Sequence, residues 1–165
     1  MSKIFLISSN SCTEPYPVFP LGMAVIAASL KRHGHNVQQF DYLVAERSIE
    51  RLRKKVQNFS PDFVAISLRN IDNVDSLTSD QNWFLAEART IVKTIREISS
   101  APIIVGGPGF SLLPEEILTY LGADYGIVGE GERVICNLIS KLEKRLPTPK
   151  IIKGRHDCLA ESEIG

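Results

Sequence analysis

The sequence predicts an α/β protein built on a doubly wound parallel sheet, and two observations carry this prediction. Short apolar runs alternate five times with amphipathic stretches of helical period along the 165 residues. Glycine, proline, asparagine or aspartate punctuates the junctions between them. Such alternation produces a parallel sheet with right-handed crossovers and helices on both faces. We therefore predict five parallel strands in a three-layer α/β/α arrangement.

Each expected strand is a short apolar run, and each expected helix shows an apolar stripe or a terminal signal. Residues 20–33 have Leu21, Val25 and Leu30 near helical spacing, and Gly34 follows as a left-handed cap. Pro114 is suited to the first position of a helix. The expected strands are 3–8, 36–40, 63–68, 102–105 and 122–128, and the expected helices are 20–33, 44–59, 82–98, 114–121 and 133–145.

Length and composition indicate one domain. Residues 1–146 hold the alternating pattern, whereas 147–165 read as a linker or tail with a short strand candidate at 150–153. Nineteen basic and nineteen acidic residues cancel, which argues against nucleic acid as a partner. No apolar run approaches the roughly 20 residues of a membrane span, so a cytoplasmic location is expected.

The cysteines and histidines suggest no catalytic or metal centre. Cys12, Cys136 and Cys158 are odd in number and far apart, so they predict neither a disulfide framework nor a metal clip. His33 and His35 flank Gly34 at a helix end, where capping explains them. His156 lies in the segment 147–165, beyond the alternating pattern.

The loops that follow the strands are the places to look for a ligand, because open parallel sheets bind at their carboxyl edge. After the fourth expected strand come Gly106, Gly107, Pro108 and Gly109, which let a backbone approach a ligand or simply form a tight turn. No lysine near Ser111 completes a phosphate loop, and the dinucleotide spacing GxGxxG also fails. Both observations argue against a nucleoside triphosphate or a nicotinamide dinucleotide as the ligand.

Two further loops carry polar side chains to the same edge. Residues 129–132 read Gly-Glu-Gly-Glu, which fits either helix capping or contact with a ligand that offers hydroxyl or amide donors. Residues 67–73 form either an ordinary polar loop or a binding loop in which Arg69 supplies a planar five-donor fork.

Four segments together resemble the N-terminal cobalamin-binding domain of cobalamin-dependent radical S-adenosylmethionine proteins. The segments are 16–30, 31–37, 104–109 and 122–132, and the match covers about residues 3–145 in order. The resemblance implies a Rossmann-like, flavodoxin-like cobalamin-binding fold, with the corrin across the carboxyl edge and its dimethylbenzimidazole tail between the sheet and a helix. The implied cofactor-binding residues are Ser67, Leu68, Arg69, Asn70, Asp72, Gly106, Gly107, Pro108, Gly109, Phe110, Gly129, Glu130, Gly131 and Glu132.

Two departures from related proteins shape the expected function. The loop 10–15 lacks the Asp-x-His-x-x-Gly motif by which methionine synthase and the mutases supply a histidine to cobalt, so no protein histidine is expected on the metal. The CxxxCxxC motif for a four-iron four-sulfur cluster is also missing. The domain alone is therefore expected to be non-catalytic and to present cobalamin to a radical S-adenosylmethionine domain, in cis or in trans, for methyl transfer.

Two alternatives from other classes stay open at this point. The same fold serves flavin- or nucleotide-binding flavodoxin-like modules, because fold alone does not fix function. It also serves receiver-like interaction domains, which need an acidic pocket at the end of the first strand. This sequence has Ser8, Ser9 and Asn10 there.

Overall fold

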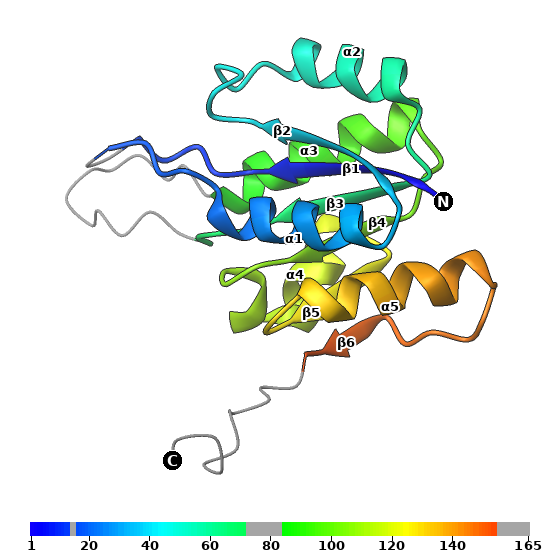
Figure 1. Ribbon diagram of the computed structural model, residues 1–165. Coiled ribbons are helices and arrows are strands. Elements are labelled where there is room, and N and C mark those ends of the chain that lie inside the picture. Colours follow the sequence, from blue (N-terminus) through cyan, green and yellow to red (C-terminus); the bar gives the residue numbers. More distant parts are fainter. Residues whose placement is uncertain (14–15, 72–83, 155–165) are drawn as a thin grey trace, which may run out of the picture.

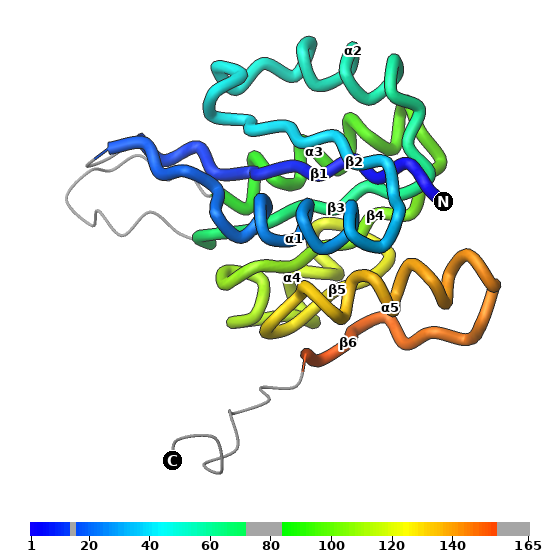
Figure 2. The backbone as a smooth tube through the Cα atoms, in the orientation of Figure 1, coloured from blue at the N-terminus to red at the C-terminus, as the bar shows by residue number. Residues whose placement is uncertain are grey.

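The protein forms one parallel sheet covered by helices on both faces (Figures 1 and 2). This computed structural model describes residues 1–13, 16–71 and 84–154. The six described strands lie in the order β2-β1-β3-β4-β5-β6, and all neighbours are parallel. The elements are β1 Lys3–Ser8, α1 Leu21–Arg32, β2 Asn36–Asp41, α2 Ile49–Phe59, β3 Phe63–Ser67, α3 Phe84–Ile98, β4 Ile103–Gly106, the short 3₁₀ helix η1 Phe110–Leu112, α4 Pro114–Leu121, β5 Tyr125–Val128, α5 Glu132–Glu143 and β6 Ile151–Lys153.

The predicted parallel α/β architecture is confirmed, but the sheet has one strand more than expected. β6 lies within the segment that the sequence suggested as linker or tail, and it pairs with β5 through registers such as Ile127 with Ile152. Ile152 also packs against the buried cluster beneath α1 and α5. A three-residue strand has no period of its own, so its place depends on the free edge that β5 provides.

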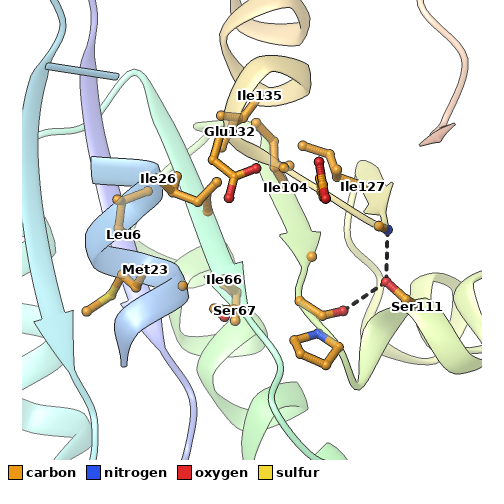
Figure 3. A pocket seen from close by; sticks show the side chains of 18 of the residues that line it. Leu6, Met23, Ile26, Ile66, Ser67, Ile104, Ser111, Ile127, Glu132 and Ile135 are labelled. Carbon is orange, nitrogen blue, oxygen red and sulfur yellow. Dashed lines mark hydrogen bonds between the residues drawn. The ribbon is translucent and has the colours of Figure 1, made fainter. Parts of the chain in front are cut away.

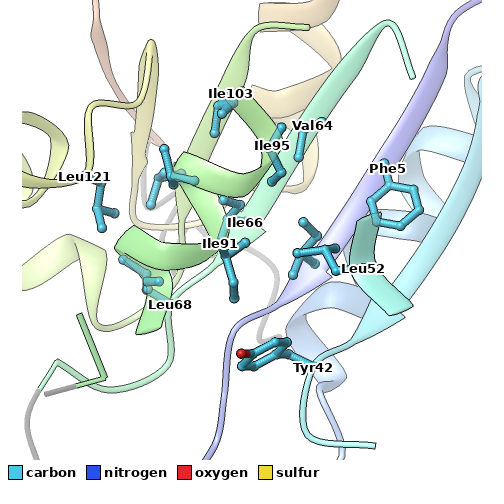
Figure 4. Close-up of a cluster of buried hydrophobic side chains, with 14 of the residues drawn as sticks. Phe5, Tyr42, Leu52, Val64, Ile66, Leu68, Ile91, Ile95, Ile103 and Leu121 are labelled. Atoms are coloured by element: carbon cyan, nitrogen blue, oxygen red, sulfur yellow. The ribbon is translucent and has the colours of Figure 1, made fainter. Parts of the chain in front are cut away.

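Alternating side chains along the central strands supply two separate cores, as the two-residue period of a strand requires. Ile4 and Leu6 of β1 belong to the cluster that packs against α1 and α5. Phe5 and Ile7 belong to the larger cluster, which packs against α2, α3 and α4 (Figure 4). The sheet is therefore the middle of three layers, as predicted.

Some predicted boundaries are corrected by local hydrogen bonds. The second helix begins at Ile49 instead of residue 44, because the Asp41 carboxylate accepts from the amide of Leu43 at 3.0 Å and stabilises a turn. Ser48 then caps α2 by accepting from the amide of Arg51 at 3.2 Å. Gly122 belongs to the cap of α4, with φ of 70°, and β5 starts only at Tyr125.

The order of the strands places a topological switch point between β1 and β3. The connection from β1 runs outward to β2 through α1, whereas the connection from β3 runs to β4 through α3 on the opposite face. Ligands in open α/β sheets bind beyond the carboxyl ends of strands at such a point. None of the described helices has the length and apolar character that crossing a membrane would require.

Candidate functional site: a cavity at the carboxyl edge

A cavity of about 410 Å³ lies between the sheet and the two helices α1 and α5, and it reaches the carboxyl edge of the strands (Figure 3). Its floor is formed by β1, β3, β4 and β5, and its walls by the first turns of α1 and α5. The lining residues are Leu6, Ile7, Gly22, Met23, Ile26, Ala65, Ile66, Ser67, Ile104, Gly106, Gly107, Pro108, Ser111, Ile127, Gly129, Glu130, Gly131, Glu132 and Ile135.

The cavity exists because small residues stand where the central strands face α1. Ala65 and Ser67 of β3 and Gly106 of β4 share this face, next to the larger Leu6 and Ile104. A side chain on Gly106 would meet Ile127 only at ordinary contact distances of 3.4 and 3.7 Å. The space is therefore set by side-chain size and is not closed off by the backbone.

Gly22, in the part of the cavity wall that α1 forms, also lacks a side chain. This residue lies in the first turn of α1, where a Cβ would have no heavy atom within 4 Å. Glycine in a helix is less favourable than alanine by roughly 0.5–1 kcal/mol. Gly22 thus keeps space open at the cavity wall at a small cost to the helix.

The glycine loop after β4 contributes to the cavity and also joins two strand ends. Gly107 has φ of 101°, and a Cβ there would lie 2.5 Å from the carbonyl oxygen of Leu68. Gly109 has an ordinary φ of −63°, but a Cβ would come within 3.1 Å of the Arg69 backbone. Packing within the chain therefore requires a glycine at position 107 and leaves little room for a side chain at position 109, independently of any ligand.

Ser111 connects the glycine loop to the loop after β5. Its hydroxyl donates to the carbonyl of Gly107 and accepts from the amide of Gly129, each at 3.1 Å (Figure 3). The two loops at the cavity mouth are therefore held as one unit. Ser67 is the other serine at this mouth.

All four residues of the Gly-Glu-Gly-Glu segment line the cavity. Glu132, the first residue of α5, projects into it, with its carboxylate beside Ile26 and Ile104 (Figure 3). Its backbone carbonyl accepts from the Ser29 hydroxyl at 2.9 Å and from the Cys136 thiol at 3.4 Å. Because Ser29 and Cys136 are both buried, the start of α5 is fixed against α1.

The remaining predicted site residues lie elsewhere. Leu68 and Phe110 are buried in the cluster on the opposite side of the sheet and do not line the cavity. Arg69 is exposed at the carboxyl edge and Asn70 is partly buried beside it, both outside the cavity lining, as is Gly109. Asp72 lies outside the described residues.

Sequence reasoning missed the apolar residues that α1 and α5 contribute. Met23, Ile26 and Ile135 have the helical spacing of ordinary core residues, and nothing in their pattern marks the cavity. The one available signal was Gly22, a glycine early in a predicted helix.

The described histidines lie away from the cavity, at the amino edge of the sheet where α1 ends. His33 Nδ1 lies 2.8 Å from the carbonyl oxygen of Ser29, and His35 Nδ1 accepts from the amide of Ser2 at 3.3 Å. Burial lowers the pKa of His35, and the Glu143 carboxylate partly opposes this effect. The described residues contain no cluster of three or more histidine, cysteine or acidic side chains able to hold a metal ion.

A second cavity of about 590 Å³ lies between α5 and the segment that leads into β6. Its lining includes the charged residues Arg133, Lys141 and Lys153, together with Glu130 and Glu132, which line both cavities. It touches only the edge strand of the sheet, away from the topological switch point. The geometry therefore favours the first cavity as the functional site.

Known proteins are similar to this chain in sequence and in fold. Residues 13–139 match the family model of the B12 binding domain. Tryptophan 2-C-methyltransferase of Streptomyces laurentii is 29% identical over 158 residues, which are 92% of this chain and 26% of that protein. The radical S-adenosylmethionine methyltransferase TsrM of Kitasatospora setae, solved with cobalamin and a [4Fe-4S] cluster, superposes with a TM-score of 0.79 at 28% identity. That superposition covers 88% of this chain and 25% of the other.

More distant structures share the fold. The cobalamin-dependent S-adenosylmethionine radical enzyme OxsB matches with a TM-score of 0.68 at 21% identity, over 89% of this chain and 19% of that one. The receiver domain of the response regulator TorR matches with a TM-score of 0.53 at 17% identity, over 88% of this chain and 98% of that one. The chain spans about a quarter of the length of its methyltransferase relatives. On the family match, which covers most of the chain, this protein belongs to the B12-binding domain family.

Proposed function

We propose that this domain binds cobalamin with the corrin across the carboxyl edge of the sheet and the nucleotide tail in the cavity between the sheet, α1 and α5. The proposal rests on the cavity itself, which reaches the carboxyl ends of β3, β4 and β5 beside the topological switch point and is walled by apolar side chains. A flat benzimidazole ring suits such a slot, because it offers apolar surface on both faces.

The residues at the edge suit the polar periphery of the corrin. Arg69 is exposed on the loop after β3, where its guanidinium can donate to amide carbonyl or phosphate oxygens. In the proposal, Asn70 and Asp72 bind corrin amides or the tail from the same loop. Gly106, Gly107 and Pro108 form the low rim over which the tail enters.

We also propose that no histidine of this protein binds the cobalt ion of the cofactor. Support comes from His33 and His35, which lie at the amino edge, and from the loop after β1, which has no histidine. A tail held in the cavity cannot also place its benzimidazole on cobalt. Bound cobalamin is therefore expected to have its base detached from the metal.

Replacing all three histidines tests this coordination directly. The triple variant His33→Gln, His35→Gln, His156→Gln should bind cobalamin with an affinity within about twofold of the wild-type value, because no imidazole is lost from cobalt. Its visible absorption spectrum should overlay that of the wild-type complex. A shift of the corrin bands in the variant would show that a histidine is a ligand.

We further propose that the domain presents cobalamin to a radical S-adenosylmethionine domain, in cis or in trans, for methyl transfer. The methyltransferase relatives are about four times as long as the matched region, and TsrM is described with cobalamin and a [4Fe-4S] cluster. In this proposal the partner domain would supply S-adenosylmethionine and the cluster, and cobalamin would supply the cobalt chemistry of methyl transfer. This domain contributes the binding cavity and the orientation of the corrin.

A retention experiment tests cobalamin binding. The purified chain is mixed with hydroxocobalamin, free ligand is removed by gel filtration, and the visible spectrum of the protein peak is recorded. We expect close to one corrin per chain, with the spectrum of cobalamin whose base is off the metal. The same assay with a flavin or a nucleotide serves as the comparison, and retention of either of these in place of the corrin would overturn the proposal.

A further inference from the structure

Glu132 is one of two glutamates that line the cavity, the other being Glu130. The carboxylate of Glu132 projects among isoleucine side chains from α1 and β4 (Figure 3). Among the described residues, no side chain or backbone group donates a hydrogen bond to this carboxylate or forms an ion pair with it. A carboxylate in apolar surroundings gains most from a donor, because partial desolvation makes an unpaired acceptor costly.

The position of Glu132 is fixed by the packing of α5 on α1. Ser29, a residue only 4% exposed, donates a hydrogen bond from its hydroxyl to the Glu132 carbonyl, and the Cys136 thiol does the same from the next turn of α5. Gly131 precedes Glu132 in the chain. A Cβ added to Gly131 would lie only 3.0 Å from the Cδ1 atom of Ile26, so the two helices are in close contact there. The backbone of Glu132 is thus fixed at the cavity wall, and its side chain extends from there into the cavity.

The chemistry of a carboxylate restricts what it can recognise. When ionised, it accepts hydrogen bonds and donates none. It repels a phosphate, which carries the same charge. A nucleotide tail contains one anionic group, the phosphate, and hydroxyl donors on its sugar, so the carboxylate distinguishes between these two parts.

We infer that Glu132 is the specificity-determining residue for the tail of the corrinoid, accepting a hydrogen bond from a sugar hydroxyl and keeping the phosphate at the cavity mouth. This inference rests on the proposed function. Ser67, on the opposite side at the mouth, leaves a polar position for the phosphate end of the tail. Ser29 is a positioning residue, because it acts on the ligand only through Glu132.

The test compares two corrinoids that differ only in the nucleotide tail. Dissociation constants for cobalamin and for cobinamide, which lacks the tail, are measured by absorbance titration. Glu132→Ala should weaken cobalamin binding about 10- to 100-fold, as expected for loss of a hydrogen bond to a charged group. Cobinamide binding should change less than about twofold. Glu132→Gln keeps an acceptor oxygen and should lose only about 3- to 10-fold on cobalamin.

Two controls separate recognition from helix stability. Glu116 is exposed in the first turn of α4, so Glu116→Ala removes an equivalent helix-dipole interaction without touching the cavity, and it should leave both affinities unchanged. Ser29→Ala should weaken cobalamin binding in the wild-type background and have no further effect in Glu132→Ala, the coupling expected when one residue acts through another.

Each result decides one question. If the wild-type chain binds neither corrinoid, the proposed function fails. If it prefers cobalamin and Glu132→Ala keeps that preference, only the inference about Glu132 fails. An equal loss for cobalamin and cobinamide would place Glu132 at the corrin instead of the tail, and tighter binding by Glu132→Gln would place it against the phosphate. Both outcomes overturn the inference.

Discussion

Replacing Ala65 with phenylalanine is expected to abolish cobalamin binding while leaving the protein folded. Ala65 lies on β3 at the floor of the cavity, between Leu6 of β1 and Ile104 of β4. A benzyl group there grows into about 410 Å³ of open space, so it buries apolar surface without the strain of an overpacked core. It also occupies the slot assigned to the tail. We expect the affinity for cobalamin to fall more than about 100-fold.

A matched change at Ala28 controls for the added aromatic ring. Ala28 is exposed on the outer face of α1, so Ala28→Phe should leave cobalamin affinity within about twofold of the wild-type value. Circular dichroism and thermal unfolding of both variants establish that the sheet is intact. Full cobalamin affinity in a folded Ala65→Phe protein would show that the tail does not enter this cavity.

Replacing Gly107 with alanine is expected to destabilise the protein by about 3 kcal/mol or more. The φ of 101° disfavours any side chain, and the added Cβ would stand 2.5 Å from the Leu68 carbonyl oxygen. That backbone cannot move freely, because the amide of Leu68 donates to the Gly106 carbonyl and its carbonyl accepts from the amide of Gly109. Denaturant unfolding of the variant measures the loss.

Gly22→Ala provides the contrasting result. Its Cβ meets nothing within 4 Å and its φ is ordinary for a helix, so alanine should leave stability unchanged or raise it by up to roughly 1 kcal/mol. Equal stability of Gly107→Ala and the wild-type protein would mean that the glycine loop is not held by its contact with β3.

Much of the fold could be predicted from the sequence because its signals are local. The helix that begins at Pro114 and ends at Leu121 was predicted with its observed bounds, since Pro114 marks its first residue and Gly122 follows its last. β6 could not be assigned to the sheet from three residues, because it needs the edge of β5 as a partner. The start of α2 was misplaced because a turn between Asp41 and Ser48 interrupts the apolar pattern.

A cavity lies at the carboxyl edge, where the sequence predicts the site, and which predicted residues line it depends on the face that each side chain takes. Ser67 ends β3 facing the cavity, so Leu68 next to it enters the opposite core by the two-residue alternation of extended chain. Phe110 is buried in that same core against Gly126. Apolar helix residues such as Ile26 and Ile135 could not be predicted, because a cavity wall and a filled core require the same pattern.

The central claim, that the tail of the cofactor lies in the cavity between the sheet, α1 and α5, is tested most directly by the affinities of the wild-type chain for cobalamin and cobinamide. A tail buried against the apolar walls should make cobalamin bind at least about 100-fold more tightly, equivalent to about 2.7 kcal/mol. Equal affinities for the two corrinoids would contradict the claim, because they would show that the tail contributes nothing to binding.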